Sequence, residues 1–393
     1  MTNNIVAKFR KTRQLFPVAN KAKGIVYLNS ASTGPLSRPV KQALYDYYEM
    51  TQYLEKSAID HDAFAALDKI RKLSAGLIGA RPNEIGFGFS TTFGLNVAAF
   101  GLPLKSGDEI LLSDIEFPAN VYPWLALKER GIKVRFLKSS NRCFDIDNFR
   151  RSIGKKSRVL SLSFVQFFNG YKNDMQEIGK ICKEKGLYFV VDGIQGCGAE
   201  SIDVHKCQID IFSSGAQKWL LSPLGTGIFS VKAELQKKIK FPFASWLSID
   251  WKLKFTDLFH YDLPFFDSAR RFEMGTYPYA HVFALEAALG LISSLGVRNV
   301  QKHNHELLDR LISYLQAHDK FQIVSSLDPN CRSSILAFTC ANAAKLQKKL
   351  SAEKIISSYR EGAIRVSVHL FNDRSDIDRL IGALERHVGK VKN

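Results

Sequence analysis

Short apolar runs alternate with amphipathic stretches from about residue 65 onward, and this alternation predicts the fold of most of the chain. Seven runs have the length and composition of buried strands: residues 84–89, 109–113, 133–137, 158–164, 187–192, 209–213 and 226–231. Helical patterns lie between them, such as residues 174–185, in which Ile178, Ile181 and Cys182 share one face. This spacing indicates a three-layer α/β domain around a mainly parallel sheet.

The pattern changes after Phe283, where longer helical stretches replace the regular alternation. Helices are predicted over residues 284–295, 299–317 and 375–388 and from Ala343 onward, with strands at 321–324, 334–340 and near 364–368. We therefore expect a large α/β domain over residues 41–290 and a smaller α+β domain over residues 291–393. The N-terminal arm, residues 1–40, is expected to pack with the small domain.

The composition is that of an ordinary soluble globular protein, with 46% hydrophobic and 24% charged residues among 393. The longest uncharged run, residues 85–104, contains Gly, Ser, Thr, Asn and Pro throughout, so we expect no membrane span. The six cysteines form no CxxC pair and no signal peptide precedes them, which favours free thiols in a cytoplasmic protein. His303 and His305 are two apart on a predicted helix and point to different faces, so we expect no metal site.

The net charge of +17 is high and raises the question of a nucleic-acid partner. The lysines are spread along the chain, however, and no zinc finger, helix-turn-helix or aromatic RNA-binding motif accompanies them. We expect a solvated basic surface that attracts anionic substrates, and no nucleic-acid function. A basic binding module with a vestigial cofactor site is the remote alternative.

Lys218 and Asp192 are the residues whose placement is most informative. Asp192 ends the apolar strand pattern 187–191, and Lys218 lies on the turn after the later strand pattern 209–213. Ligands in such sheets bind at the carboxyl ends of the strands. A lysine amine can condense with an aldehyde, and a carboxylate can hold a pyridine nitrogen protonated, which together are what a pyridoxal phosphate site requires.

The segment GFSTTFGLN at positions 88–96 joins a predicted strand to a predicted helix. Free N–H groups at a helix start favour a phosphate, and the Thr91 and Thr92 hydroxyls can add hydrogen bonds. A plain helix cap is the alternative interpretation. Three further motifs follow: SDIEFPANVYPW at 113–124, FEMGTYP at 272–278 and REGAIRVSVHLFN at 360–372.

Together these motifs, in this order along residues 27–384, resemble class-V, fold-type I pyridoxal phosphate enzymes. That superfamily includes cysteine desulfurases, selenocysteine lyases, isopenicillin-epimerase-like proteins and several aminotransferases. The resemblance implies pyridoxal phosphate as cofactor. One segment departs from the desulfurase pattern, which has an asparagine near position 167; Gln166 and Asn169 are the two candidate replacements.

The resemblance also implies roles for the residues around the cofactor. Lys218 forms the aldimine and moves the proton at the substrate α-carbon, and Asp192 faces the ring nitrogen. Phe117 stacks on the ring where many relatives have histidine, so it positions the cofactor but carries no proton. Gln195 hydrogen-bonds the phenolic oxygen, and Gln217 stands where relatives commonly have histidine.

Substrate and partner contacts follow from the same resemblance. Arg365 matches the arginine that holds the substrate carboxylate, for which a guanidinium fork is well suited. An ordinary strand arginine paired with an acid is the alternative. Asn29 and Ala31 are expected to line the substrate pocket. Gly275 and Thr276 are expected to reach the neighbour's phosphate across the interface of a homodimer.

A missing cysteine narrows the range of reactions that we expect of this protein. Cysteine desulfurases carry a nucleophilic cysteine shortly before the carboxylate-binding arginine, whereas residues 341–393 contain no cysteine. Without that thiolate no persulfide can form, which disfavours desulfuration. We expect an aminotransferase-type enzyme that acts on an α-amino acid, with C–S or C–Se β-elimination or α-carbon epimerisation as the alternatives.

Overall fold

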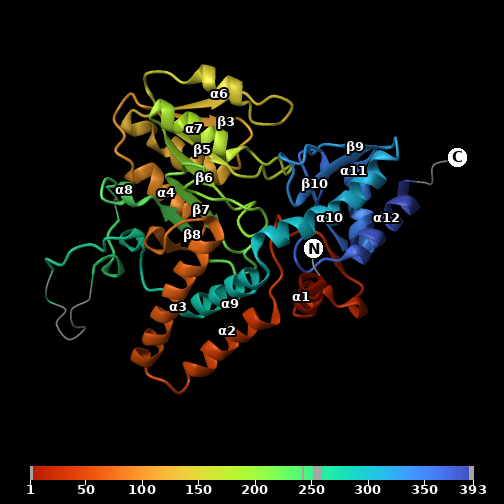
Figure 1. Ribbon diagram of the computed structural model, residues 1–393, viewed down its shortest axis with the longest axis horizontal. Coiled ribbons are helices and arrows are strands. Elements are labelled where there is room, and N and C mark those ends of the chain that lie inside the picture. Colours follow the sequence, from red (N-terminus) through yellow and green to blue (C-terminus); the bar gives the residue numbers. More distant parts are fainter. Residues whose placement is uncertain (1–2, 241–242, 251–258, 260, 389–393) are drawn as a thin grey trace.

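A seven-stranded sheet forms the centre of the larger lobe, with the order β2-β8-β7-β6-β5-β3-β4 (Figure 1). Its strands are β2 (Ile85–Gly88), β3 (Glu109–Ser113), β4 (Lys133–Leu137), β5 (Ser157–Ser163), β6 (Tyr188–Asp192), β7 (Ile211–Gly215) and β8 (Gly227–Val231). Only β8 runs against its neighbours, β2 and β7. The computed structural model describes residues 3–240, 243–250, 259 and 261–388. The predicted strands and the mainly parallel α/β fold are confirmed.

Alternate residues of the central strands pack on opposite faces of this sheet. Phe189 and Val191 of β6 belong to one hydrophobic core, whereas Val190 between them belongs to another. The covering helices are α3 (Lys56–Ile78), α7 (Met175–Lys185) and α9 (Tyr279–Leu295) on the first face, and α4 (Thr91–Gly101) and α5 (Tyr122–Leu125) on the second. Because helices bury both faces, central strands such as β6 are mainly apolar, and the sheet is the middle of three layers.

The smaller lobe is built on a four-stranded antiparallel sheet in the order β12-β13-β10-β9. Its strands are β9 (Phe321–Ile323), β10 (Ile335–Cys340), β12 (Ser358–Arg360) and β13 (Ala363–Ser367). Its helices are α10 (Val297–Gln316), α11 (Ala343–Ala352) and α12 (Arg374–Val388), which bury their apolar faces in a separate core. A two-residue parallel pair, β1 (Val26–Tyr27) with β11 (Ile355–Ile356), joins the N-terminal segment to this lobe.

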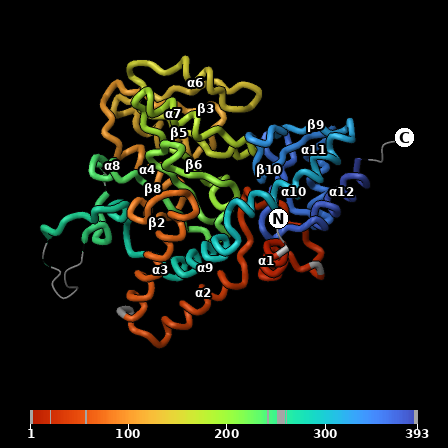
Figure 2. Tube along the Cα trace, in the orientation of Figure 1, coloured from red at the N-terminus to blue at the C-terminus, as the bar shows by residue number. Residues whose placement is uncertain are grey.

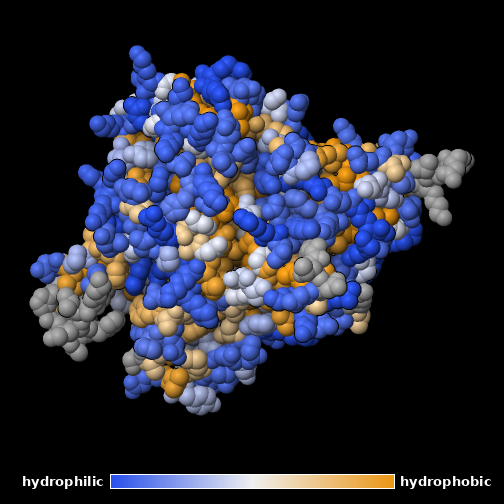
Figure 3. Space-filling view, in the orientation of Figure 1, coloured by the Kyte–Doolittle hydropathy of each residue, from blue (hydrophilic) through white to orange (hydrophobic). Residues whose placement is uncertain are grey.

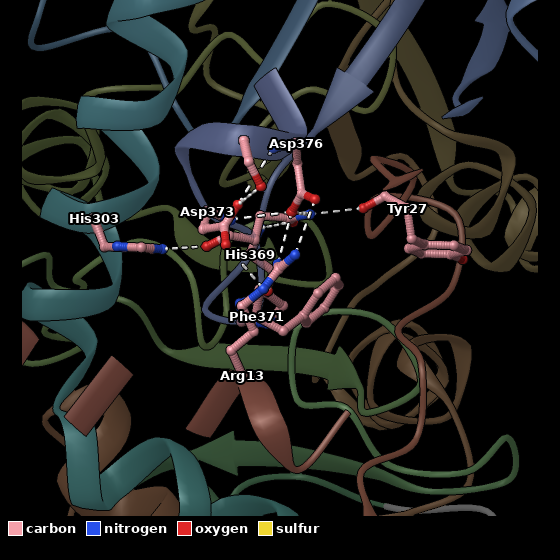
Figure 4. Close-up of polar contacts among 9 residues, drawn as sticks. Arg13, Tyr27, His303, His369, Phe371, Asp373 and Asp376 are labelled. Carbon is pink, nitrogen blue, oxygen red and sulfur yellow. Dashed lines mark hydrogen bonds and ion pairs between the residues drawn. The ribbon is translucent and has the colours of Figure 1, made fainter. Parts of the chain in front are cut away.

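The N-terminal helix α1 (Asn3–Gln14) lies below α10 in the view of Figure 2, and its side chains contact α10 and α12. Arg13 forms ion pairs of 3.1 Å with Asp373 and 2.7 Å with Asp376 (Figure 4). Phe9 stacks on His303 with ring centroids 4.3 Å apart. A second helix, α2 (Arg38–Met50), then crosses to α9 in the larger lobe. The domain boundaries at residues 40 and 290 stay a prediction.

Hydrophilic residues cover most of the face drawn in Figure 3, and hydrophobic residues appear there in smaller groups. No single helix in the described part of the chain is long and apolar enough to cross a membrane. The bent pair α9 and α10 meets that test only in combination, across a bend of 74°. Much of α9 is buried in the core of the larger lobe.

A buried ion pair fixes α3 to the segment that precedes α9. Arg71 Nη2 lies 2.8 Å from both carboxylate oxygens of Glu273, and the two side chains are 7% and 0% exposed. The Phe87 N–H of β2 donates to Glu273 at 2.9 Å, and the Tyr277 hydroxyl donates to it as well. Glu273 therefore joins a helix, a strand and a loop through a single carboxylate.

We expect Glu273→Gln to lower the free energy of unfolding by about 3–5 kcal/mol, because the Arg71 charge stays buried without its partner. The shift of the urea unfolding midpoint measures this loss. Glu286→Gln is the matched control, since Glu286 pairs with Lys69, which is 63% exposed, and such pairs contribute less than about 1 kcal/mol. Equal midpoint shifts in the two variants would contradict the prediction.

Candidate active site

A cavity of about 340 Å³ lies at the carboxyl ends of the parallel strands, between the two lobes. Nine predicted site residues line it: Ala31, Thr91, Thr92, Phe117, Asp192, Gln195, Gln217, Lys218 and Arg365. Its volume is within the range of about 300–1,000 Å³ that is typical of small-molecule sites. The fold thus brings together residues that are up to 334 positions apart in the sequence.

Asp192 is a buried carboxylate, and only one of its two oxygens accepts a hydrogen bond within the described residues. Oδ1 accepts a hydrogen bond from the Ile194 N–H at 2.9 Å, whereas Oδ2 has no hydrogen-bond partner within the described residues. Burial raises the pKa of Asp192 to about 7; the Ile194 N–H and Lys218 oppose this rise, and Glu116 adds to it. A cationic N–H group beside Oδ2 would supply the missing partner and favour the ionised carboxylate.

Lys218 lies on the turn that follows β7. Burial lowers the pKa of its amine to about 8, the charge of Asp192 opposes this shift, and the charges of Arg365 and Arg360 add to it. The backbone of the turn is tightly packed, because a Cβ on Gly34 would lie only 2.2 Å from the Lys218 carbonyl oxygen. A glycine is therefore required where the N-terminal segment crosses the turn, and the lysine is held in place from that side.

The start of α4 forms the opposite wall of the cavity. Ser90 caps the helix by accepting from the Phe93 N–H at 3.3 Å, and Thr91 Oγ1 accepts from the Gly215 N–H at 2.8 Å. The first N–H groups of any helix have no partner inside it and carry its positive dipole end. Since Ser90, Thr91 and Thr92 all line the cavity, this wall is suited to an anion.

Gln195 is fixed by two hydrogen bonds. Its Oε1 accepts from the Trp219 indole N–H at 3.0 Å, and its Nε2 donates to the Ala31 carbonyl at 3.0 Å. His369 supports the indole from behind, where it contacts the Trp219 carbonyl oxygen at 2.9 Å through Nε2 and is fully buried. An amide NH₂ group has two hydrogens, so the second one remains to reach a ligand in the cavity.

Two aromatic rings form the remaining wall. Phe117 is 40% exposed, and Phe167 meets it edge-on with ring centroids 5.2 Å apart. The Lys218 amine lies 5.7 Å from the centre of the Phe117 ring. Phe117 thus lies on the cavity wall beside Lys218, and its stacking on a cofactor ring stays a prediction.

The sequence left open whether Gln166 or Asn169 replaces the asparagine that desulfurases have near position 167. Gln166 Nε2 donates to Glu116 at 3.0 Å, and Asn169 Nδ2 donates to the Arg142 carbonyl at 2.9 Å. Neither residue is among those that line the cavity, whereas Phe167 is. Neither of these two amides therefore takes the place of the asparagine expected from the desulfurase pattern.

Glu116 is a buried carboxylate that links the segments carrying Phe117 and Phe167, and the sequence analysis did not identify it. Its carboxylate accepts hydrogen bonds from Asn120, Ser163 and Gln166, at distances between 2.6 and 3.0 Å. Burial nevertheless raises its pKa. The interaction connects the end of β5 to the loop that carries Phe117.

Arg365 of β13 is 2% exposed and carries no acid partner within the described ranges. It donates to Ser32 Oγ at 2.8 Å, to Ser358 Oγ at 3.1 Å and to the Phe167 carbonyl oxygen. Burial, with the nearby charge of Arg360, lowers its pKa to about 10. The alternative of a strand arginine paired with an acid is thus excluded for the described residues, and the buried charge is available to an anionic ligand.

The class-V aminotransferase family matches residues 26–380, which is most of the chain. The chain belongs to this family. It is 30% identical to a probable cysteine desulfurase of Ureaplasma parvum, covering 95% of this chain and 96% of that protein. It is 27% identical to the uncharacterized aminotransferase YcbU of Bacillus subtilis, covering 94% and 95%.

The fold also matches that of a solved structure. The cystine C–S lyase C-DES, in a form with glycine covalently linked to its pyridoxal phosphate cofactor, superposes with a TM-score of 0.84 at 22% identity. The match covers 95% of this chain and 98% of that one. The resemblance inferred from the motifs is confirmed at the level of family and fold.

Three predicted residues lie outside the cavity of this class-V protein. Asn29 does not line the cavity but is connected to it through Ser32. Its Oδ1 accepts a hydrogen bond from the Ser32 hydroxyl, which in turn accepts one from Arg365. Gly275 and Thr276 are exposed on a loop where Gly275 has a φ of 73°. Their expected contact with the phosphate of a second subunit stays a prediction.

Arg360 and Ser32 line the cavity but escaped the sequence analysis. The signal for Arg360 was the Glu-Gly pair at positions 361–362, which is typical of a turn and lies directly before the predicted strand near 364–368. No group of three or more His, Cys, Asp or Glu side chains that could hold a metal occurs among the residues described. His303 and His305 have separate partners, the Asn372 carbonyl oxygen and Glu200.

Proposed function

We propose that this protein is a pyridoxal-phosphate-dependent enzyme of the aminotransferase type that acts on α-amino acids. The observation that supports this most directly is the unpartnered, buried Oδ2 of Asp192 in the same cavity as Lys218 and Arg365. A carboxylate oxygen that has lost its hydration and has no donor calls for a cationic N–H ligand. A pyridinium ring provides one.

The residues of the cavity fit this cofactor. The first turn of α4, with Thr91 and Thr92, would hold the phosphate, and Asp192 Oδ2 would face the ring nitrogen. Gln195 would reach the phenolic oxygen, and Phe117 would cover the ring. Pyridoxal phosphate supplies an aldehyde that bonds to amines and a ring that accepts electrons from the substrate α-carbon.

Lys218 and Arg365 would act on the substrate itself. An amine with a pKa near 8 is partly unprotonated at neutral pH, so Lys218 can accept and return the proton of the α-carbon. The Arg365 guanidinium, held by Ser32 and Ser358, would fix the α-carboxylate and so orient the bond to that proton. Phe117 and Gln217 stand where many relatives have histidines and add no titratable group.

A C–S or C–Se lyase is the second candidate, favoured by relatives described as a cystine C–S lyase and as probable cysteine desulfurases. Because no cysteine occurs in residues 341–393, such a lyase would release its product directly and not through a protein persulfide. Epimerisation at the α-carbon would need the same residues. We further propose a cytoplasmic homodimer, in which Gly275 and Thr276 complete the phosphate site of the other subunit.

The product decides among these reactions. The holoenzyme would be mixed with a panel of amino acids while its absorption spectrum is followed and the products are analysed. We expect a 2-oxo acid together with a stoichiometric amount of cofactor in its amine form. Release of sulfide, selenide or pyruvate with the cofactor unchanged would assign a lyase, and racemised amino acid alone would assign an epimerase.

Arg365→Gln is expected to weaken binding of the amino acid by about 10- to 100-fold, since a charge-assisted hydrogen bond contributes about 1.5–3 kcal/mol. The cofactor should remain bound, because Arg365 lies on the substrate side of the cavity. Spectral titration of the holoenzyme with its substrate gives the dissociation constant. Unchanged affinity in this variant would remove the proposed role.

A further inference from the structure

The cavity holds a second guanidinium, that of Arg360, in addition to Arg365 and Lys218. The hairpin of β12 and β13 explains why both arginines point to the same place. Ser358 pairs with Arg365 and Arg360 pairs with Ala363 across the antiparallel strands. Paired residues, and residues two apart on one strand, share a face, so the register puts both guanidinium groups on one side of the hairpin.

The turn between the two strands fixes this register. Glu361 and Gly362 have φ angles of 46° and 84°, which are the positive values of a two-residue hairpin loop whose twist matches the strands. A slip by one residue would move one of the arginines to the opposite face. The placement of Arg360 is thus a consequence of the backbone.

Among the residues that the structure describes, neither arginine has a carboxylate partner. In the described ranges neither guanidinium forms an ion pair, and Arg360 makes a 3.4 Å contact with the carbonyl of its neighbour Tyr359. The charge of Arg360 contributes to lowering the pKa values of both Lys218 and Arg365. Asp192 is the one acid that lines the cavity along with these three cations in the described residues, so the site has room for more than one negative charge.

We propose that Arg360 selects α-amino acids whose side chain ends in a second acid group, a carboxylate or a sulfinate. This rests on the proposed function, in which Arg365 holds the α-carboxylate and Lys218 acts at the α-carbon. Arg360 then remains for the far end of the substrate. Ser32 cannot take this part, because its hydroxyl is engaged by Arg365 and Asn29.

The experiment compares the binding of succinate and butyrate to the holoenzyme by calorimetry at low ionic strength. These two acids have the same length and differ in one carboxylate. We expect succinate to bind about tenfold more tightly, the low end of what a hydrogen bond between charged groups contributes. Arg360→Gln should abolish this preference and leave the affinity for butyrate unchanged. Titration with 3-sulfinopropanoate separates a sulfinate from a carboxylate side chain, and a preference for either dianion that depends on Arg360 supports the proposal.

Arg150→Gln is the matched control. Arg150 lies outside the cavity and pairs with Glu177 at 2.8 Å, so the variant loses the same charge without touching the hairpin or the cavity lining. A succinate preference that survives in Arg360→Gln, or that disappears equally in Arg150→Gln, would overturn the proposal. Cofactor content, read from absorbance in every variant, tests the proposed function separately: a wild type without cofactor would refute that function, whatever the succinate preference.

Discussion

Lys218→Ala is expected to abolish covalent attachment of pyridoxal phosphate and to reduce turnover by at least about 10²–10⁴-fold, the share that proton transfer alone contributes. The variant loses the amine that bonds to the cofactor and the group that moves the proton at the α-carbon. After borohydride treatment, mass spectrometry of peptides should find the cofactor on the wild-type peptide that contains Lys218. The variant should show no modified peptide.

Two further variants make this result specific. Lys218→Arg keeps the positive charge and loses the nucleophile, so it should fail to form the covalent link as Lys218→Ala does. Lys232→Ala removes a lysine that pairs with Asp210 outside the cavity and should retain the link. A covalent adduct on another lysine would refute the assignment. A wild-type protein that never takes up cofactor, and that binds nucleic acid in a salt-dependent way, would favour the vestigial alternative.

Asp192→Asn is expected to lower turnover by about 10- to 10³-fold while the cofactor stays attached. An opposite charge at contact distance shifts a pKa by about 1–3 units, and each unit is worth about 1.4 kcal/mol. The amide keeps the shape of the side chain and its contact with Ile194, but it no longer favours a protonated ring nitrogen. Steady-state rates and cofactor absorbance are measured together. Unchanged turnover in a holoenzyme variant would remove the proposed role of Asp192.

We also expect Asp192→Asn to change the pH dependence of the rate at which pyridoxal phosphate attaches to Lys218. Because the pKa of Lys218 is lowered to about 8, pyridoxal phosphate should attach to cofactor-free protein at a rate that rises with pH through about 8. An unperturbed lysine would require about pH 10.4. Asp192 raises this pKa and Arg365 lowers it, so Asp192→Asn should move the midpoint to lower pH and Arg365→Gln to higher pH. Midpoint shifts of the opposite sign would contradict this account of the electrostatics.

Much of the fold could be predicted because the sheet lies between two helical layers. Strands buried on both faces are continuous apolar runs, such as 187–191, and their hydrophobic pattern does not depend on distant partners. The ends of those runs were predictable as well, and with them Asp192 and Lys218, since polar residues directly after buried strands mark the ligand edge of the sheet. The antiparallel pairing of β8 with β2 and β7 could not be predicted in this way, because the hydrophobic pattern of a strand does not show its direction.

The sequence by itself thus determined the fold class, the family and the residues at the strand ends, because these depend on local pattern and short motifs. Only the tertiary structure decided that Phe167 and not Gln166 or Asn169 faces the cavity, because Glu116, distant in sequence, engages the Gln166 amide. It also decided that Arg360 joins Arg365, since a two-residue turn pairs β12, which the pattern did not predict, with β13. Periodicity records which residues are buried. Which side chains meet in a cavity depends on register and on contacts between segments far apart in the chain.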